Sequence, residues 1–130
     1  MSIVFTNGCF DILHRGHIEL LEFCKSKGSR VVVGLNSDAS IKRLKGDSRP
    51  VFSQHDRKKI LESIRFVDKV IIFEEDTPYS VIKSLNPDII VKGGDYTEDQ
   101  VVGNDLCKVI IFEYIDGYST TKTIKNISNR

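Results

Sequence analysis

Residues 5–17 read Phe5-Thr6-Asn7-Gly8-Cys9-Phe10-Asp11-Ile12-Leu13-His14-Arg15-Gly16-His17. The apolar run Ile3-Val4-Phe5 ends at Asn7-Gly8, and a helical apolar pattern begins near Leu20. This order predicts a strand, a glycine turn and the start of a helix. A helix start offers unpaired N–H groups and a partial positive charge, which together form a ready anion site.

Two histidines lie in this turn, three residues apart. Because that spacing is about one helical turn, the side chains of His14 and His17 can point to the same side of the helix start. Helix capping and half of a metal site are the alternative interpretations. His55 is the only other histidine in the sequence, and no cysteine completes a convincing zinc set with the pair. The pattern therefore favours a phosphate site over a metal site.

Strand and helix patterns alternate along the chain. Strands are predicted at Ile3–Thr6, Arg30–Asn36, Lys69–Phe73, Asp88–Lys92 and Lys108–Tyr114. Helices are predicted at Arg15–Lys27, Asp38–Leu44, Gln54–Phe66, Pro78–Leu85 and Thr120–Ile127. This order predicts one α/β domain, residues 1–130, with a five-stranded parallel sheet and helices on both faces.

The segments between these elements differ in how clearly they can be assigned. Lys45–Phe52 is polar and contains Gly46 and Pro50, so it is predicted to be a loop. Tyr96–Leu106 shows no clear pattern.

Among the core positions, Cys24 of the first helix is expected to be buried, and three residues of the Gln54–Phe66 helix are expected to face inward. These three are Ile60, Leu61 and Ile64.

Polar and glycine-rich clusters follow each predicted strand. In open parallel sheets, ligands bind at the carboxyl ends of the strands, near the point where the strand order reverses. These clusters are therefore expected to share one edge of the sheet. They are Asn7-Gly8, Asn36-Ser37-Asp38, Glu74-Glu75-Asp76, Gly93-Gly94-Asp95 and Asp116-Gly117-Tyr118-Ser119.

The composition excludes several classes of protein. The 130 residues carry 19 basic and 18 acidic side chains, a formal net charge of +1, which gives no general electrostatic reason to bind nucleic acid or a membrane surface. Three cysteines at irregular positions do not suggest a disulfide framework. With no long apolar run and no signal peptide, a soluble cytoplasmic protein is expected. No Walker loop and no GxGxxG spacing follow the first strand, so neither a P-loop ATPase nor a Rossmann dehydrogenase is favoured.

The motif Gly8–His17 resembles the glycine-phenylalanine-aspartate and HxGH signature of the cytidylyltransferase-like nucleotidyltransferases. Within them, the chain resembles the D-glycero-D-manno-heptose 1-phosphate adenylyltransferase branch, which also occurs as the C-terminal half of a bifunctional heptose kinase/adenylyltransferase. The matching stretches span nearly the whole chain. They are Asn36-Ser37-Asp38, Lys42-Arg43-Leu44-Lys45-Gly46, Arg49-Pro50, Glu74-Glu75-Asp76-Thr77-Pro78, Val91-Lys92-Gly93-Gly94-Asp95-Tyr96 and Ser119-Thr120-Thr121.

The resemblance implies a Rossmann-like nucleotidyltransferase fold and an activity. A sugar phosphate oxygen would attack the α-phosphorus of ATP with Mg²⁺ present, releasing pyrophosphate and forming an ADP-heptose for lipopolysaccharide or another surface polysaccharide. The second ionisation of a phosphate monoester lies near pH ~6, so no general base is needed. The resemblance further implies a homodimer, and another protein is expected to supply the phosphorylated sugar. A cytidylyltransferase acting on glycerol 3-phosphate or another sugar or polyol phosphate is the alternative enzyme, and a nucleotide-binding regulatory module is the alternative from another class.

The resemblance also assigns roles to residues. The catalytic residues would be His14, His17, Lys42 and Lys45. Nucleotide would bind Thr6, Asn7, Gly8, Cys9, Phe10, Asp11, Gly16, Arg57, Lys92, Gly93, Asp95, Ser119, Thr120 and Thr121. The acceptor substrate would bind Asp11, Asn36, Asp38 and Arg65, and no protein-bound metal ligand is assigned.

Structural roles stay open for several of these residues. Lys42 and Lys45 can form an exposed basic patch, and Arg57 and Arg65 can be plain surface charges. Asp11 can be a residue that fixes the turn. Ser119-Thr120-Thr121 can be simply the cap and first turn of the last helix. Relatives acting on glycerol phosphate often carry an arginine shortly before this serine. Here the segment is Asp116-Gly117-Tyr118-Ser119, which argues against that substrate.

Overall fold

The sheet of this chain has five parallel strands in the order β3-β2-β1-β4-β5. A computed structural model describes residues 2–113 and 120–128. The predicted sheet is confirmed, because each predicted strand corresponds to one in the structure. The strands are β1 (Ile3–Gly8), β2 (Arg30–Asn36), β3 (Lys69–Phe73), β4 (Ile89–Gly93) and β5 (Lys108–Phe112).

The helices follow the predicted order, with one notable difference in length. They are α1 (Arg15–Lys27), α2 (Asp38–Lys45), α3 (Gln54–Glu62), α4 (Tyr79–Leu85), the short 3₁₀ helix η1 (Glu98–Gln100) and α5 (Thr120–Ser128). The prediction that α3 runs to Phe66 is wrong. The chain tightens after Glu62 into turns, with the Ser63 N–H donating to the Ile60 carbonyl and the Ile64 N–H to the Leu61 carbonyl.

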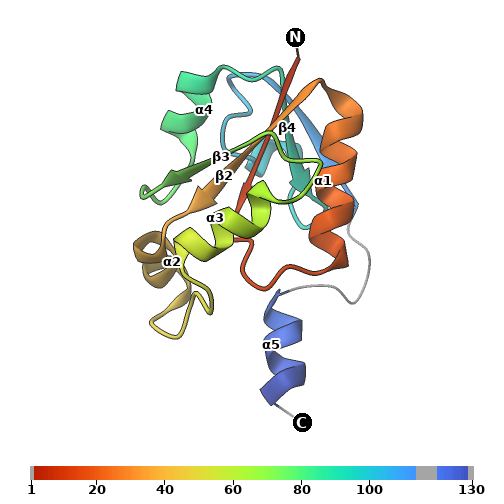
Figure 1. Cartoon of the computed structure of the whole chain (residues 1–130). Helices are drawn as coiled ribbons and strands as arrows, with labels where there is room; N and C mark the ends of the chain where they lie inside the picture. Colours follow the sequence, from red (N-terminus) through yellow and green to blue (C-terminus); the bar gives the residue numbers. More distant parts are fainter. Residues whose placement is uncertain (1, 114–119, 129–130) are drawn as a thin grey trace.

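Two apolar cores lie on opposite faces of the sheet (Figure 1). On one face, α1 and α3 cover the sheet, with Leu21, Cys24 and Leu61 fully buried as predicted. On the other face, α4 and the segment after β4 cover Phe5 and its neighbours. The expectation that Ile60 faces inward is wrong, since 42% of it is exposed.

The strand order reverses at β1. It pairs with β2 on one side and with β4 on the other, so the connections after β1 and after β4 leave toward opposite sides of the sheet. That switch point is where ligands bind in open parallel sheets. In Figure 1 the connection from β1 to α1, the helix α2 and the loop after it all lie at the lower end of the molecule. The sequence clusters after β1, β2 and β4 therefore share one end, as expected.

A fold prediction concerns Gly34, in the middle of β2. A Cβ atom built there would lie 2.6 Å from Cζ of Phe5, inside one of the two cores. Because that ring is packed, Gly34→Ala should lower the free energy of unfolding by about 1–3 kcal/mol. Urea unfolding measures this change. Ser84→Ala, on the exposed face of α4, is the control and should change the value by less than about 0.5 kcal/mol; an equally stable Gly34→Ala protein would contradict the packing described.

Candidate functional site

His14 and His17 build the start of α1 between them. The backbone N–H of Gly16 donates to Nδ1 of His14 at 3.0 Å, and the backbone N–H of His14 donates to Nδ1 of His17 at 3.2 Å. This is the reciprocal arrangement of a capping box, made here by two imidazoles instead of a hydroxyl and a carboxylate. The alternative interpretation of helix capping is thus part of what the histidines do.

The capping bonds also fix the protonation of each neutral ring. A neutral imidazole carries one N–H and one acceptor nitrogen, and Nδ1 of each ring is the acceptor here. The remaining proton of each ring therefore lies on Nε2. The two rings lie close together, with centroids 3.9 Å apart and planes 33° apart. The pair consequently places two Nε2–H donors close together beside the helix start, with the Nε2 atom of His14 buried.

Burial keeps both rings neutral. Desolvation by burial, together with a smaller effect of the nearby His14, lowers the pKa of His17 to about 4. Desolvation also lowers the pKa of His14. At neutral pH the pair is thus a set of hydrogen-bond donors rather than a pair of cations. Any positive charge for a bound phosphate must come from the helix start and from lysines or arginines.

The turn before the helix is held in an unusual backbone conformation. Phe10 and Ile12 have φ values of 46° and 54°, in the left-handed region that a β-branched residue rarely adopts. The buried ring of Phe10 packs against the His17 ring at a centroid distance of 5.4 Å. Packing of this ring helps to hold the strained turn. Backbone strain of this kind is typical of functional sites, where the geometry has to be fixed in advance.

Asp11 ties this turn to the loop between α2 and α3. Its buried carboxylate accepts the Val51 N–H at 2.6 Å and the Phe52 N–H at 3.0 Å, and lies 3.6 Å from Nε of Arg49. The turn-fixing role that the sequence left open for Asp11 is therefore present. Its predicted contact with substrate stays a prediction. Arg49 was not among the predicted site residues, although its place in a matching polar loop was a signal for it.

Arg57 braces the same region from inside. It is 1% exposed, and its guanidinium donates to the carbonyls of Phe52, Cys9 and Asn36 at 3.0, 2.8 and 2.8 Å and to Asp38 at 2.8 Å. These bonds join the turn after β1, the end of β2 and the start of α3. The alternative of a plain surface charge is wrong for Arg57, while its predicted phosphate contact stays a prediction.

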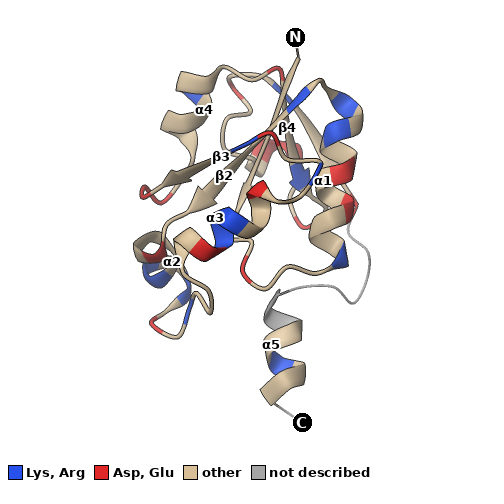
Figure 2. Cartoon of the chain, in the orientation of Figure 1, with Lys and Arg blue, Asp and Glu red and all other residues tan. Residues whose placement is uncertain are grey.

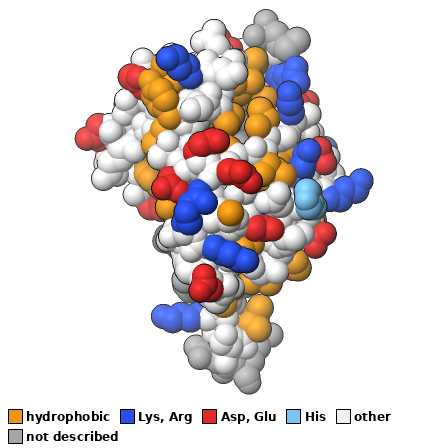
Figure 3. All heavy atoms as spheres, turned by 90° about the vertical axis from the view of Figure 1, so that its left-hand side faces the viewer, with side chains coloured by type: hydrophobic (Ala, Val, Ile, Leu, Met, Phe, Trp, Pro, Cys, Tyr) orange, Lys and Arg blue, Asp and Glu red, His pale blue; other side chains and the backbone are white. Residues whose placement is uncertain are grey.

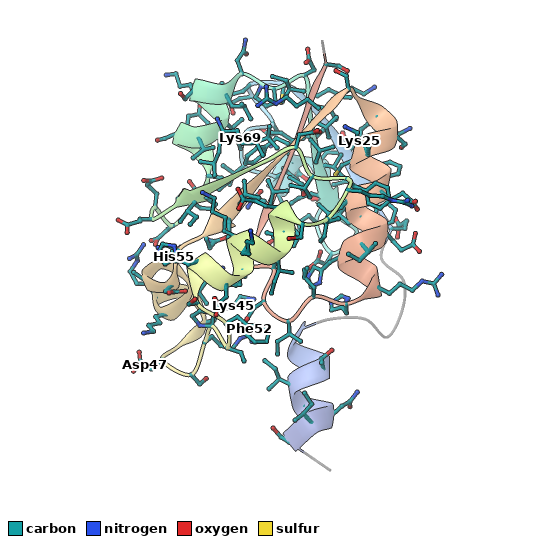
Figure 4. The ribbon with its side chains drawn as sticks, in the orientation of Figure 1. Lys25, Lys45, Asp47, Phe52, His55 and Lys69 are labelled. Carbon is teal, nitrogen blue, oxygen red and sulfur yellow. The ribbon has the colours of Figure 1, made fainter. Side chains whose placement is uncertain are left out.

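Three lysines of the predicted site reach this end from different elements. Lys42 and Lys45 are exposed on α2, and Figure 2 shows the ribbon coloured for basic residues on α2 and on the loop that follows it. Figure 4 places Lys45 and Phe52 at this lower end, away from Lys69. Lys92, on β4, is partly buried and donates to the Asn7 carbonyl at 3.1 Å. The structure therefore brings cations from α2 and β4 to the end of the sheet where the histidine turn lies.

Several of the other predicted residues fall into three groups. The Asn36 amide is buried and donates to the Ser40 hydroxyl at 3.1 Å, while Asp38 is occupied by its ion pair. Arg65 is exposed and lies over the Phe66 ring, in the segment after α3 and apart from the histidine turn. Ser119 lies outside the described residues. Thr120 and Thr121 begin α5, and their side chains are outside the description as well.

The described residues do not build a protein site for a metal ion. No group of three or more His, Cys, Asp or Glu side chains within residues 2–113 and 120–128 is arranged to hold one. The buried carboxylate of Asp11 is already bonded to two backbone N–H groups.

The face shown in Figure 3 mixes charges of both signs with scattered apolar side chains. In the described part of the chain, no helix has both the length and the apolar character needed to cross a bilayer.

Comparison with known sequences identifies relatives along almost the whole chain. The family model described as cytidylyltransferase-like matches residues 5–126. The bifunctional protein HldE of a Nitratiruptor species is 54% identical over 126 residues, 96% of this chain and 27% of that protein. The bifunctional protein HldE of Campylobacter fetus subsp. fetus is 54% identical over 127 residues, 97% of this chain and 28% of that protein. The chain thus spans about a quarter of the length of these curated relatives.

Solved structures share the fold. A lipopolysaccharide core biosynthesis protein from Thermoplasma volcanium superposes with a TM-score of 0.74 and 30% identity, covering 92% of this chain and 99% of that one. A protein of unknown function from Archaeoglobus fulgidus superposes with a TM-score of 0.71 at 16% identity, covering 94% and 96% of the two chains, which supports the fold alone.

One prediction tests the bracing role of Arg57. Arg57→Met removes bonds to three carbonyls and leaves Asp38 without its partner, so the free energy of unfolding should fall by about 3–5 kcal/mol. Urea unfolding provides the measurement. Lys59→Met, an exposed cation on the same helix, is the matched control and should be nearly neutral. A loss no larger than that of the control would mean that Arg57 is not a structural brace.

A second prediction concerns pH. Because the folded-state pKa of His17, about 4, lies below its ordinary value of 6.5, the unfolded chain binds this proton first as the pH falls. The contribution to stability, roughly 3 kcal/mol, is fully present above pH 6.5 and is lost as the pH approaches 4. Unfolding free energies should be measured at several pH values across this window.

His17→Gln is the informative variant for this test. Glutamine at this capping position can still accept the His14 N–H but does not titrate. The variant should therefore lose part of the pH dependence between 6.5 and 4, whereas His55→Gln, at an exposed histidine, should retain it. Identical pH dependence in the two variants would show that His17 is not the buried neutral ring described.

Proposed function

Because the chain belongs to the cytidylyltransferase-like family, we propose that it transfers AMP from ATP to D-glycero-D-manno-heptose 1-phosphate, releasing pyrophosphate and forming an ADP-heptose. The observation that carries the proposal is the histidine pair, whose two Nε2–H donors sit beside the start of α1 at the switch point of the sheet. The relatives named bifunctional protein HldE and the lipopolysaccharide core biosynthesis protein support a role in the synthesis of a surface sugar.

The site supplies what a phosphoryl attack needs. A phosphate monoester is already largely ionised at neutral pH, so the protein has to align two anions and stabilise the charge that develops at the α-phosphorus. Neutral, preoriented imidazoles suit this work, because their donors need no rearrangement when the charge develops. The backbone N–H groups at the start of α1 and the exposed Lys42 and Lys45 add positive potential at the same end.

Mg²⁺ would enter with the triphosphate, since the described residues offer no cluster of their own for it. Bound to phosphate oxygens, this ion neutralises charge on the triphosphate. In the same proposal Ser119, Thr120 and Thr121 contact the phosphates, and Gly93 and Asp95 lie near the base. The protein works as a cytoplasmic homodimer, and another protein supplies the phosphorylated sugar.

The alternative enzyme is a cytidylyltransferase that uses glycerol 3-phosphate or another sugar or polyol phosphate. Both reactions need the same phosphate chemistry, so the histidine pair does not separate them. The alternative from another class, a nucleotide-binding regulatory module, would keep the fold without turnover. The conjunction of both histidines with Lys42 and Lys45 favours an enzyme.

A matrix assay separates these alternatives. Pyrophosphate release should be measured with ATP and CTP, each combined with heptose 1-phosphate and glycerol 3-phosphate. The proposal expects turnover with ATP and heptose 1-phosphate. Turnover only with CTP would establish the cytidylyltransferase, and the absence of release with every pair would favour the regulatory module.

The histidines are tested by His14→Ala and His17→Ala, each of which should lower turnover by about 10²–10³, the effect of losing a preorganised donor. Loss of the helix cap is another way in which these substitutions could lower turnover, because it costs about 0.5–2 kcal/mol of stability. His17→Gln keeps the capping bond but carries its remaining N–H donors on a flexible amide instead of a rigid ring, so it should lose part of the turnover while remaining folded. His55→Ala is the matched control, and near-normal rates in all three site variants would contradict the proposed role.

A further inference from the structure

Lys92 is the one cation of the predicted set that is fixed within the sheet. It lies on β4 beside the end of β1, where its Nζ atom donates to the Asn7 carbonyl at 3.1 Å. The same ammonium lies over the ring of Tyr96, 4.8 Å from the centroid. Two contacts from different segments thus hold the charge in one place. An ammonium has three N–H donors, and the bond to Asn7 accounts for one of them.

A second cation lies within electrostatic range of the first. Burial lowers the pKa of Lys92, the nearby Asp95 and Cys9 oppose that shift, and Lys45 adds to it. Lys45 comes from the exposed end of α2, so it can adjust its position, whereas Lys92 is held by β4. Like charges at the same end of the sheet favour the binding of an anion there.

Lys92 and the histidine pair contact different residues. The imidazoles are bonded to the start of α1 and packed on Phe10, whereas Lys92 contacts Asn7 and Tyr96. A transferase that joins a triphosphate to a phosphate monoester has to hold two anions at once. The histidine pair and the helix start account for one of them.

We propose that Lys92, assisted by Lys45, binds the phosphate monoester of the acceptor substrate, while the histidine pair binds the triphosphate. This inference rests on the proposed function, because it assigns one of that reaction's two substrates to a particular cation. The fixed ammonium sets the position of the acceptor phosphate at the end of β4, and the exposed lysine of α2 completes the contact. Lys92 thereby favours acceptors that carry a phosphate over neutral sugars.

Kinetics with two substrates provides the first test. Lys92→Met keeps the length of the side chain and removes the charge, so the KM for heptose 1-phosphate should rise by about 10–100-fold, as expected for loss of a charge-assisted hydrogen bond. The KM for ATP should change by less than about threefold. Lys69→Met, an exposed lysine at the start of β3, is the matched control and should change neither value. A larger effect on the KM for ATP than on that for the acceptor would overturn the proposal.

Chemical labelling of the unmodified protein provides a second test that does not need a folded variant. Pyridoxal 5′-phosphate joins a phosphate to an aldehyde, which condenses with an uncharged amine with loss of water; borohydride then reduces the imine to a stable secondary amine. Peptide mass spectrometry should find Lys92 labelled ahead of Lys69 near pH 7.5. Glucose 1-phosphate should protect it, and ATP alone should not. Protection by ATP alone, or equal labelling of both lysines, would overturn the assignment.

The two tests separate this inference from the proposed function. If no triphosphate releases pyrophosphate, the proposed function fails, but labelling of Lys92 and its protection by a phosphate monoester still report on the anion site. If turnover is found and Lys92→Met leaves the acceptor KM unchanged, the proposed function stands and the assignment of Lys92 is wrong.

Discussion

The site depends on hydrogen bonds that two imidazoles make to the start of α1. Each Nδ1 atom accepts a backbone N–H, so the rings are part of the helix terminus and are not free side chains attached to it. This single arrangement determines where the rings lie, which nitrogen carries the proton and how closely the rings approach each other. The anion-binding character of the helix start and the donor character of the histidines are consequently one structural feature.

Charged groups behind this terminus hold the surrounding loops in place. The Asp11 carboxylate binds the loop before α3, and the Arg57 guanidinium binds three carbonyls from three segments. Burying a charge without partners is costly. Here the charges of Asp11 and Arg57 are both hydrogen-bonded to backbone groups. The strained residues Phe10 and Ile12 flank Asp11, and Phe10 directly follows Cys9, whose carbonyl is bonded to Arg57. The shape of the turn is therefore fixed by the fold before any ligand binds.

The sequence predicted the sheet, the order of elements and the gathering of polar clusters at the carboxyl ends of the strands. Those features follow from apolar periodicity and glycine turns, which are local signals. It did not predict that α3 ends at Glu62 or that Ile60 is exposed, because helix ends depend on tertiary packing. It also gave no sign that Arg57 is enclosed. Spacing along a chain does not show whether a guanidinium meets solvent, a phosphate or three carbonyls from separate segments of the chain.

The reciprocal cap restricts which side chains can replace the histidines. A lysine or arginine at position 14 would attract phosphate more strongly than a neutral ring, yet it has no acceptor for the Gly16 N–H and would leave that group without a side-chain bond. An asparagine or serine could cap the helix but would be too short to carry a second donor outward. Imidazole alone among the common side chains places an acceptor and a donor on opposite sides of one rigid ring, so the helix terminus and the ligand can be held at the same time.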